Sequence, residues 1–139
     1  MTPDEMASVF GSFIHAHRVR DIDGLVALFT EDAEYEVVGD PYGRRHGHES
    51  IRRRYEEAFE ELGDACITVA RQASGENLLF TESVMTAKAI GTIFGVEGGG
   101  RDVTYRVLHL CEFREGRISK QTVWVDASEL MAQLLAPKE

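Results

Sequence analysis

The stretch VTYRVLHLCEF, residues 103–113, is an almost continuous run of apolar and aromatic residues with one histidine, His109, in its middle. β-Branched and aromatic residues in a run of this length predict a β-strand. Apolar residues stand at both odd and even positions, whereas an antiparallel strand with one solvated face needs them only at every second position. We therefore expect both faces of this strand to be covered.

Further extended segments flank this run, and turns that contain glycine separate them. Residues 65–74 and 78–95 precede it, and residues 117–125 follow it. The connections at residues 75–77 and 114–116 are short and contain glycine, as is typical of hairpin turns. The pattern predicts a meander of long antiparallel strands.

The N-terminal half of the chain is predicted to be mainly helical. Residues 2–19 begin with Pro3 and acidic residues, which favour the first turn of a helix. The apolar face of this helix repeats at helical spacing and consists of Met6, Phe10, Phe13, Ile14 and His17. Residues 21–38 predict a short helix, capped by Asp21, that leads into a first strand in which Ala33, Tyr35 and Val37 alternate.

Two more helices are predicted on either side of the meander. The turn sequence GDPYG at residues 39–43 and the segment RRHG lead into a helix over residues 48–63, which Gly63 is expected to end. Asp126 is expected to be the N-cap of a terminal helix that follows the last strand.

This order of elements predicts an α+β fold that forms one domain over residues 1–139. Helices would gather on one face of a curved sheet. The other face would be covered by a second copy of the chain, so we expect a homodimer that packs sheet against sheet. Trp124 is expected to point out of the sheet and to anchor that interface.

Composition excludes several classes of function. The formal net charge of −9, from 15 basic and 24 acidic residues, disfavours nucleic acid as a partner. The basic clusters at residues 44–45 and 52–54 are expected to be solvated. Cys66 and Cys111 lie far apart in the sequence without the spacing of metal ligands, so we expect them to be ordinary buried thiols. The sequence contains no metal-ligand cluster and no phosphate-binding motif, so we expect no metal and no cofactor.

No membrane partner is expected either. The sequence has no apolar run near the roughly 20 residues that a membrane span requires, and no signal peptide opens it. The expected location is the cytoplasm.

Several segments, in one order along the chain, carry a resemblance to a known superfamily. They are RDIDGLVALFTEDAEYE, GRRHGHESIRRRY, GTIFGVEGGGRDV, HLCEFREGRI and DASELMAQLL. Together they resemble the SnoaL-like polyketide cyclases and ketosteroid isomerases, the superfamily that includes nuclear transport factor. The resemblance implies a cystatin-like cone, in which a curved, mainly antiparallel sheet wraps around the N-terminal helices. It also implies a mainly apolar pocket in the mouth of the cone and dimerisation through the sheet.

The catalytic positions of these families are only partly retained. Where the isomerases have a tyrosine, a basic aspartate and a protonated aspartic acid, this chain has Phe13, Val37 and His109. Steroid isomerisation by that mechanism is therefore not expected. The cyclases resemble the chain more closely because they carry a histidine at the position of His109, although their acid–base aspartate corresponds to Val123.

Strand alternation indicates which side chains accompany His109. If its ring faces the interior of the cone, Tyr105, Val107, Cys111 and Phe113 face it too. Tyr35 shares a side with Val37 and is expected to reach the same space. A histidine beside tyrosines in an apolar pocket can exchange protons near neutral pH. The alternative is a buried neutral histidine that is hydrogen-bonded to a carbonyl or a tyrosine.

Two hypotheses follow for the function. The first is a cofactor-independent lyase, isomerase or cyclase of a small apolar substrate of polyketide or terpenoid kind, with His109 as the acid–base group and Tyr35 or Tyr105 orienting an oxygen. The second is a ligand-binding or scaffolding protein without chemistry. In both, the pocket is lined by Phe13, His17, Val37, Tyr105, Val107 and Val123. Glu82 and Lys88 are both even-numbered residues of one predicted strand, so their side chains lie on the same face. The sequence pattern does not decide whether that face is inside or outside the cone.

Overall fold

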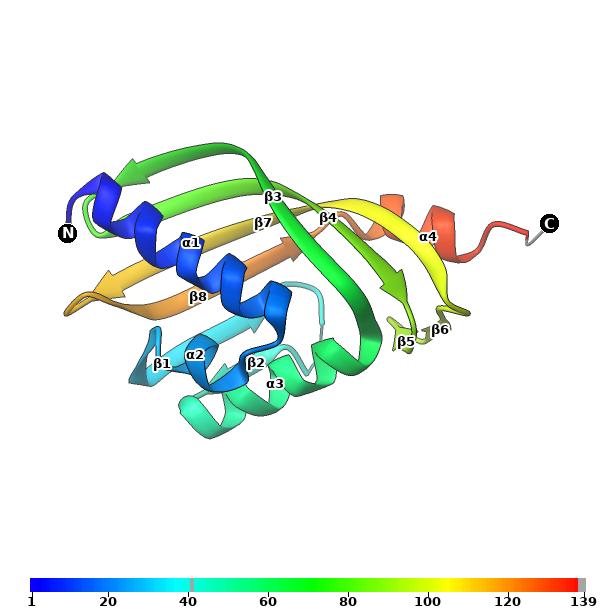
Figure 1. Cartoon of the computed structure of the whole chain (residues 1–139), viewed down its shortest axis with the longest axis horizontal. Coiled ribbons are helices and arrows are strands. Elements are labelled where there is room, and N and C mark those ends of the chain that lie inside the picture. Colours follow the sequence, from blue (N-terminus) through cyan, green and yellow to red (C-terminus); the bar gives the residue numbers. More distant parts are fainter. Residues whose placement is uncertain (41, 138–139) are drawn as a thin grey trace.

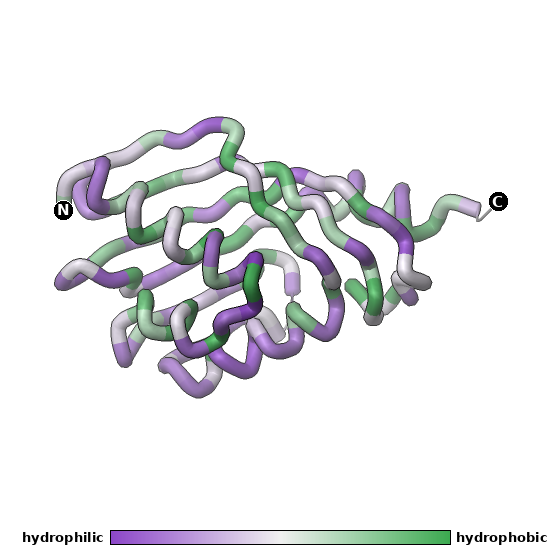
Figure 2. The backbone as a smooth tube through the Cα atoms, viewed as in Figure 1, coloured by the Kyte–Doolittle hydropathy of each residue, from purple (hydrophilic) through white to green (hydrophobic). Residues whose placement is uncertain are grey.

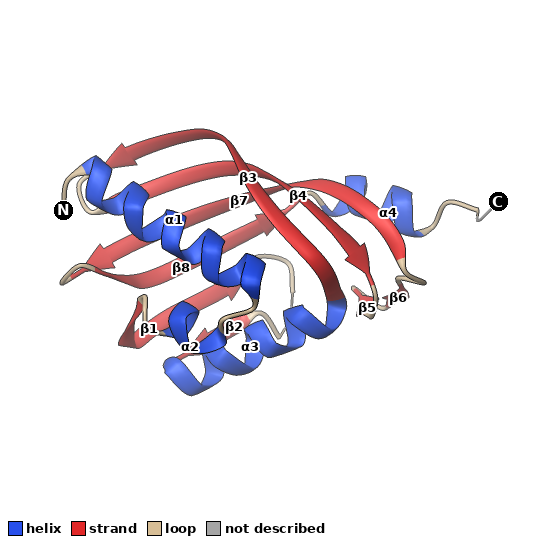
Figure 3. Cartoon of the chain, in the orientation of Figure 1, coloured by secondary structure: helices blue, strands red, loops and turns tan. Residues whose placement is uncertain are grey.

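A computed structural model describes residues 1–40 and 42–137 of the chain. Figure 1 shows the order of its helices and strands, and Figure 3 separates the two kinds of element. The elements are α1 (Pro3–Val19), α2 (Ile22–Val26), β1 (Phe29–Val37), β2 (Arg44–His46), α3 (His48–Glu61), β3 (Leu62–Gly75), β4 (Leu78–Ala89), β5 (Thr92–Ile93), β6 (Val96–Glu97), β7 (Arg101–Arg114), β8 (Arg117–Val125) and α4 (Ala127–Leu134).

The main sheet has six strands in the order β2-β1-β8-β7-β4-β3. All neighbouring strands are antiparallel except β1 and β8, which run parallel. The sheet bends around α1, and α1, α2 and α3 lie on its concave side (Figure 1). The predicted α+β cone is therefore confirmed.

The sheet is bent and has distinct inner and outer faces. The register between β3 and β4 shifts between Val69 and Arg71, and such a bulge increases the local bend of a strand. Along β7 the odd-numbered residues from Val103 to Phe113 are buried. They point into the cone, as the alternation of a strand requires. Figure 2 shows hydrophobic residues recurring along the long strands and a mainly hydrophilic α3.

The start and end of α1 follow from its sequence. The Thr2 side chain accepts a hydrogen bond from the Glu5 amide, Glu5 reaches back to the Thr2 amide, and Pro3 occupies the first turn. At the other end, Arg20 donates hydrogen bonds from Nη2 to the carbonyl oxygens of Phe59 and Leu62. Because these carbonyls lie at the end of α3, Arg20 ties the two helices together.

The predicted strand over residues 78–95 is wrong beyond Ala89, where β4 ends. The amides of Ile90 and Gly91 donate to the Glu61 carbonyl at 3.0 and 3.1 Å, so the chain turns towards the end of α3. A side chain at Gly91 would place its Cβ 2.6 Å from the Glu60 carbonyl oxygen, which explains the glycine. The segment that follows forms the small β5–β6 hairpin.

Two further boundaries differ from those predicted. Helix α3 ends at Glu61, and Gly63 already pairs with Lys88 in the β3–β4 ladder. The first three residues of the segment RRHG form the short strand β2, in which Arg45 pairs with Tyr35 of β1, and Gly47 is the N-cap of α3. Gly63 is thus a strand residue and does not end the helix.

The outer face of the sheet carries both ion pairs and apolar side chains. Glu82 pairs with Arg71 at 2.8 Å and Lys88 with Asp102 at 2.9 Å, so the structure places both Glu82 and Lys88 outside the cone. Apolar residues on the same face form what we call the outer patch, which consists of Phe80, Val84, Leu108, Leu110 and Trp124. Trp124 therefore points away from the interior, as predicted.

Helix α4 covers a part of β7 that lies beyond the end of β8. Asp126 accepts a hydrogen bond from the Glu129 amide, which confirms it as the N-cap. The Gln133 side chain accepts from the Thr104 amide at 2.8 Å and donates to the Thr104 carbonyl at 2.7 Å. Side chains of α4 therefore satisfy the backbone hydrogen-bonding groups at this edge of β7. Within residues 1–40 and 42–137, none of the helices combines the length and apolarity needed to cross a bilayer.

Candidate functional site

A cavity of about 280 Å³ lies inside the cone, between the concave face of the sheet and the helices α1 and α3. This volume is close to the lower end of the range of about 300–1,000 Å³ for ligand pockets. The cavity reaches the surface beside Tyr42 and Phe94, whose side chains are exposed, and we call this side the mouth. The structure brings every predicted site residue to the wall of this one cavity: Phe13, His17, Tyr35, Val37, Tyr105, Val107, His109 and Val123.

His109 lies deep in the cavity and is 4% exposed. The rings of Phe10 and Phe13 approach its imidazole edge-on, with centroids at 5.3 and 5.6 Å. Its Nδ1 atom is buried and has no hydrogen-bond partner among the described residues. Burial, with a smaller contribution from His17, lowers the pKa of His109 to about 3. The ring is therefore neutral at physiological pH, and no carbonyl or tyrosine within residues 1–40 and 42–137 holds Nδ1.

His17 is a second buried histidine on the cavity wall. Its ring packs against Phe13, Tyr55 and Phe59, with centroid separations between 5.3 and 6.0 Å. Burial and the nearby Arg20 lower the pKa of His17 to about 4. Both histidines are therefore neutral in the folded protein at physiological pH.

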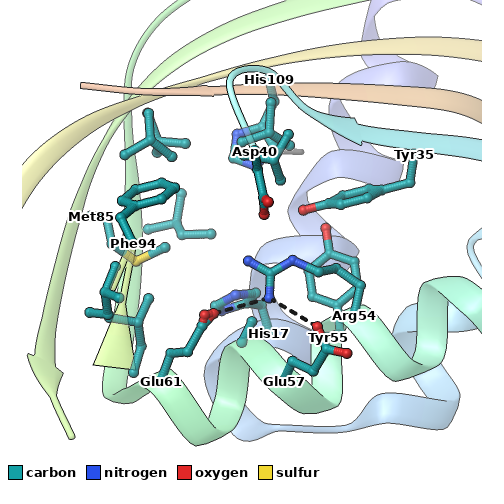
Figure 4. Close-up of a pocket in the computed structure, with 18 of the residues that line it drawn as sticks. His17, Tyr35, Asp40, Arg54, Tyr55, Glu57, Glu61, Met85, Phe94 and His109 are labelled. Carbon is teal, nitrogen blue, oxygen red and sulfur yellow. Dashed lines mark hydrogen bonds and ion pairs between the residues drawn. The ribbon is translucent and has the colours of Figure 1, made fainter. Parts of the chain in front are cut away.

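Two tyrosines face each other across one side of the cavity. The rings of Tyr35 and Tyr55 lie 5.4 Å apart, and Figure 4 shows their hydroxyls close together. Tyr55 donates to Oε1 of Gln121 at 2.6 Å, and Gln121 in turn donates to the Cys111 sulfur at 3.6 Å. Burial raises the pKa of both tyrosines, so both stay protonated. Tyr55 donates its hydrogen to Gln121, so in the hydrogen bond between the two tyrosines Tyr35 is the donor. The Tyr35 hydroxyl can turn this hydrogen from the Tyr55 oxygen towards a ligand.

Charged side chains gather near the mouth. Arg54 on α3 pairs with Glu61 at 3.1 Å and more loosely with Glu57 at 3.8 Å. Its guanidinium lies between these carboxylates and Asp40 of the β1–β2 loop (Figure 4). Arg45 also binds Glu57, at 3.1 Å. The mouth can therefore orient a polar group of a ligand, while the deeper wall is mainly apolar and aromatic.

The prediction that the whole basic cluster at residues 52–54 is solvated is wrong for Arg54, which belongs to this charged group. Arg53 is exposed, but the Arg54 side chain is only 17% exposed. A signal was available in the helical spacing, because Ile51 and Tyr55 form the buried face of α3 and Arg54 lies beside them.

The histidines of the third predicted helix and its approach lie away from this cavity. His46 is exposed, and the Nε2 atom of His48 lies 2.8 Å from the Phe29 carbonyl oxygen. Among the described residues, no group of three or more histidine, cysteine, aspartate or glutamate side chains is arranged to hold a metal ion.

Comparison with protein families assigns the chain. The family model for the SnoaL-like domain matches residues 10–121, which is most of the sequence. The chain therefore belongs to the SnoaL-like domain family.

Solved structures of low sequence identity share the fold. A protein from Jannaschia sp. CCS1, a candidate SnoaL-like polyketide cyclase, is 14% identical, with a TM-score of 0.86 over 99% of this chain and 98% of that one. IdmH from Streptomyces antibioticus, a candidate polyketide cyclase, is 21% identical, with a TM-score of 0.78 over 94% and 98%. An LEH-like epoxide hydrolase from M. tuberculosis is 20% identical, with a TM-score of 0.75 over 95% and 90%.

Proposed function

We propose that the protein is a cofactor-independent acid–base enzyme, an isomerase, cyclase or lyase, that acts on a small, mainly apolar molecule of polyketide or terpenoid kind bearing a carbonyl group. The observation that carries this proposal is the His109 ring on the wall of a cavity, which is neutral because burial lowers its pKa. Tyr35 lines the same cavity and supplies a hydroxyl donor.

The proposed step is proton transfer next to the carbonyl. Tyr35 donates a hydrogen bond to the carbonyl oxygen, and neutral His109 accepts a proton from the adjacent carbon. The electron pair of the broken C–H bond moves into the enolate, whose oxygen Tyr35 stabilises. The imidazolium then returns the proton to another carbon of the same molecule. Alternatively, the enolate carbon attacks an internal carbonyl and closes a ring, the electron pair of the C=O π bond moves onto that oxygen, and the resulting alkoxide takes the proton from the imidazolium.

The low pKa of His109 is compatible with this role. Burial lowers it because an imidazolium would have little water around it, the nearby His17 lowers it a little further, and no carboxylate among the described residues offsets these effects. An enolate formed beside the ring supplies the missing opposite charge, so the pKa of His109 rises as the proton moves. Val37 and Val123 occupy the positions that the resemblance assigns to the superfamily's carboxylate bases, so the base of the proposed step is a histidine.

The relatives support the reaction class. Two of the structures with this fold are candidate polyketide cyclases, and another is an LEH-like epoxide hydrolase. The charges of Arg54, Glu61 and Asp40 near the mouth suit a substrate with a polar end and an apolar body.

A two-ring ketone, 2-tetralone, tests the proposal. In D₂O the protein is expected to accelerate exchange of the ketone's α-hydrogens, because reversible proton transfer to His109 washes deuterium into the substrate. Proton NMR of the ketone follows the exchange, with heat-denatured protein as the control. The two valines favour the second candidate, a ligand-binding protein without chemistry. Binding of 2-tetralone with no exchange above the control would establish that candidate and refute the enzymatic proposal.

We further propose that two copies of the chain pair through the outer patch. The patch places Trp124 beside Leu108 and Phe80 beside Leu110, so it presents aromatic anchors in an apolar surface. Trp124→Glu is expected to convert a dimer into a monomer, since it would bury a charge at the centre of the interface. Light scattering measures the mass, with Arg53→Glu on the exposed surface of α3 as the control. A single-chain mass for the unmodified protein at all concentrations would exclude the dimer.

A further inference from the structure

The β5–β6 hairpin carries a residue that its turn disfavours. Thr92 pairs with Glu97 and Ile93 with Val96, which leaves Phe94 and Gly95 as a two-residue loop. Both loop residues have positive φ, 48° and 79°. Two-residue loops of this kind favour Asn-Gly, because asparagine tolerates the left-handed region and phenylalanine does not.

Packing of the hairpin does not account for the phenylalanine. The Phe94 side chain is 48% exposed, and the residue of the hairpin that is buried is its neighbour Ile93. A large, exposed, apolar side chain in a strained conformation gives the hairpin no evident gain in stability. Residues that break a local rule in this way concentrate at functional sites.

The position of Phe94 relates it to the cavity. Phe94 lines the cavity at the mouth, and its ring lies on the opposite side of the view from Tyr35, with the Asp40 side chain drawn between them (Figure 4). Met85 lies beside Phe94, and Tyr55 lies beside Tyr35. The two sides therefore offer apolar and aromatic faces to whatever enters between them.

We propose that Phe94 determines specificity by forming one wall of an aromatic slot, in which a planar aromatic ring of the substrate stacks at the mouth. This inference rests on the proposed function and narrows its substrate class to molecules with a flat, unsaturated ring system. Aromatic pairs prefer offset-stacked or edge-to-face arrangements and interact more strongly than their buried area alone predicts. A saturated ring of the same carbon skeleton lacks that contribution.

Binding of two matched alcohols, 2-naphthol and trans-decahydro-2-naphthol, tests the slot by calorimetric titration. The unmodified protein is expected to prefer the aromatic alcohol. Phe94→Asn removes the ring and improves the turn, so it is expected to reduce that preference by about 2- to 12-fold, the range that corresponds to the energy of an aromatic pair. Phe94→Trp keeps an aromatic wall and is expected to retain the preference.

The melting temperature supplies an independent measurement. Phe94→Asn is expected to leave it unchanged or to raise it by up to about 4 °C, because the Asn-Gly pair suits the turn. A marked fall would show that Phe94 serves the hairpin's stability, and an unchanged preference in Phe94→Asn would show that its ring does not contact the ligand. Either result overturns the slot and leaves the exchange test of His109 unaffected. Failure of the unmodified protein to bind 2-naphthol also overturns it.

Discussion

Acidification from pH 7 to pH 5 is expected to lower the free energy of unfolding by about 4 kcal/mol, or about 2 kcal/mol for each buried histidine. Burial lowers the pKa of His17 to about 4 and that of His109 to about 3. In the unfolded chain both groups regain a pKa near the ordinary value of about 6.5. Below that value both histidines are protonated in the unfolded chain but stay neutral in the folded chain.

The sign follows from proton binding. Stability rises with pH wherever the unfolded state binds more protons, so it is full above pH 6.5 and is lost progressively as the pH falls towards 4 for His17 and 3 for His109. Urea unfolding at pH 7, 6 and 5 measures the effect. The double variant His17→Gln and His109→Gln is expected to lose most of this pH dependence. If the free energy of unfolding changed equally with pH in the double variant and the unmodified protein, the pH dependence could not be assigned to His17 and His109.

Replacement of His109 by glutamine is expected to reduce the exchange of 2-tetralone hydrogens by about 10²- to 10⁴-fold, the usual contribution of a positioned general base. Glutamine retains polarity and approximate size but cannot accept the proton. Binding of 2-naphthol, which has the shape of the enol form of 2-tetralone, is expected to change little, because the cavity walls stay in place. The loss should therefore appear in the rate of exchange and not in affinity.

A matched control for this variant is His46→Gln. His46 is exposed and does not line the cavity, so its replacement is expected to leave the exchange rate unchanged. Exchange that persists undiminished in His109→Gln would remove His109 from the chemistry. A parallel loss in both variants would point to a general effect of histidine replacement.

The fold was predictable because its signals are local and periodic. The run at residues 103–113 became β7, whose odd-numbered residues point into the cone as alternation requires. The α1 helix begins at Pro3, as Pro3 and the acidic residues of its first turn predicted. The split of the predicted strand 78–95 was not predictable in the same way. It depends on contacts with the Glu61 carbonyl, which lies far away in sequence.

For the candidate site, the sequence could predict the residues that lie on strands but not those that lie elsewhere. Alternation placed Tyr35 and Tyr105 on the inner face together with His109. The residues near the mouth came from a helix, a loop and a hairpin, where no period-2 pattern exists. Arg54 lines the cavity because α3 packs against β1, β2 and β3, and Phe94 reaches the cavity only because the chain turns after Ala89. These placements depend on tertiary packing.

The terminal helix α4 contributes both to the wall of the cavity and to the protection of a strand edge. Its Leu130 side chain lines the cavity, while its Gln133 occupies the hydrogen-bonding groups of Thr104 on β7. Detachment of α4 would widen the binding space and at the same time expose an unpaired strand edge, which can recruit strands of other molecules. The same few side chains therefore couple ligand retention to resistance against aggregation.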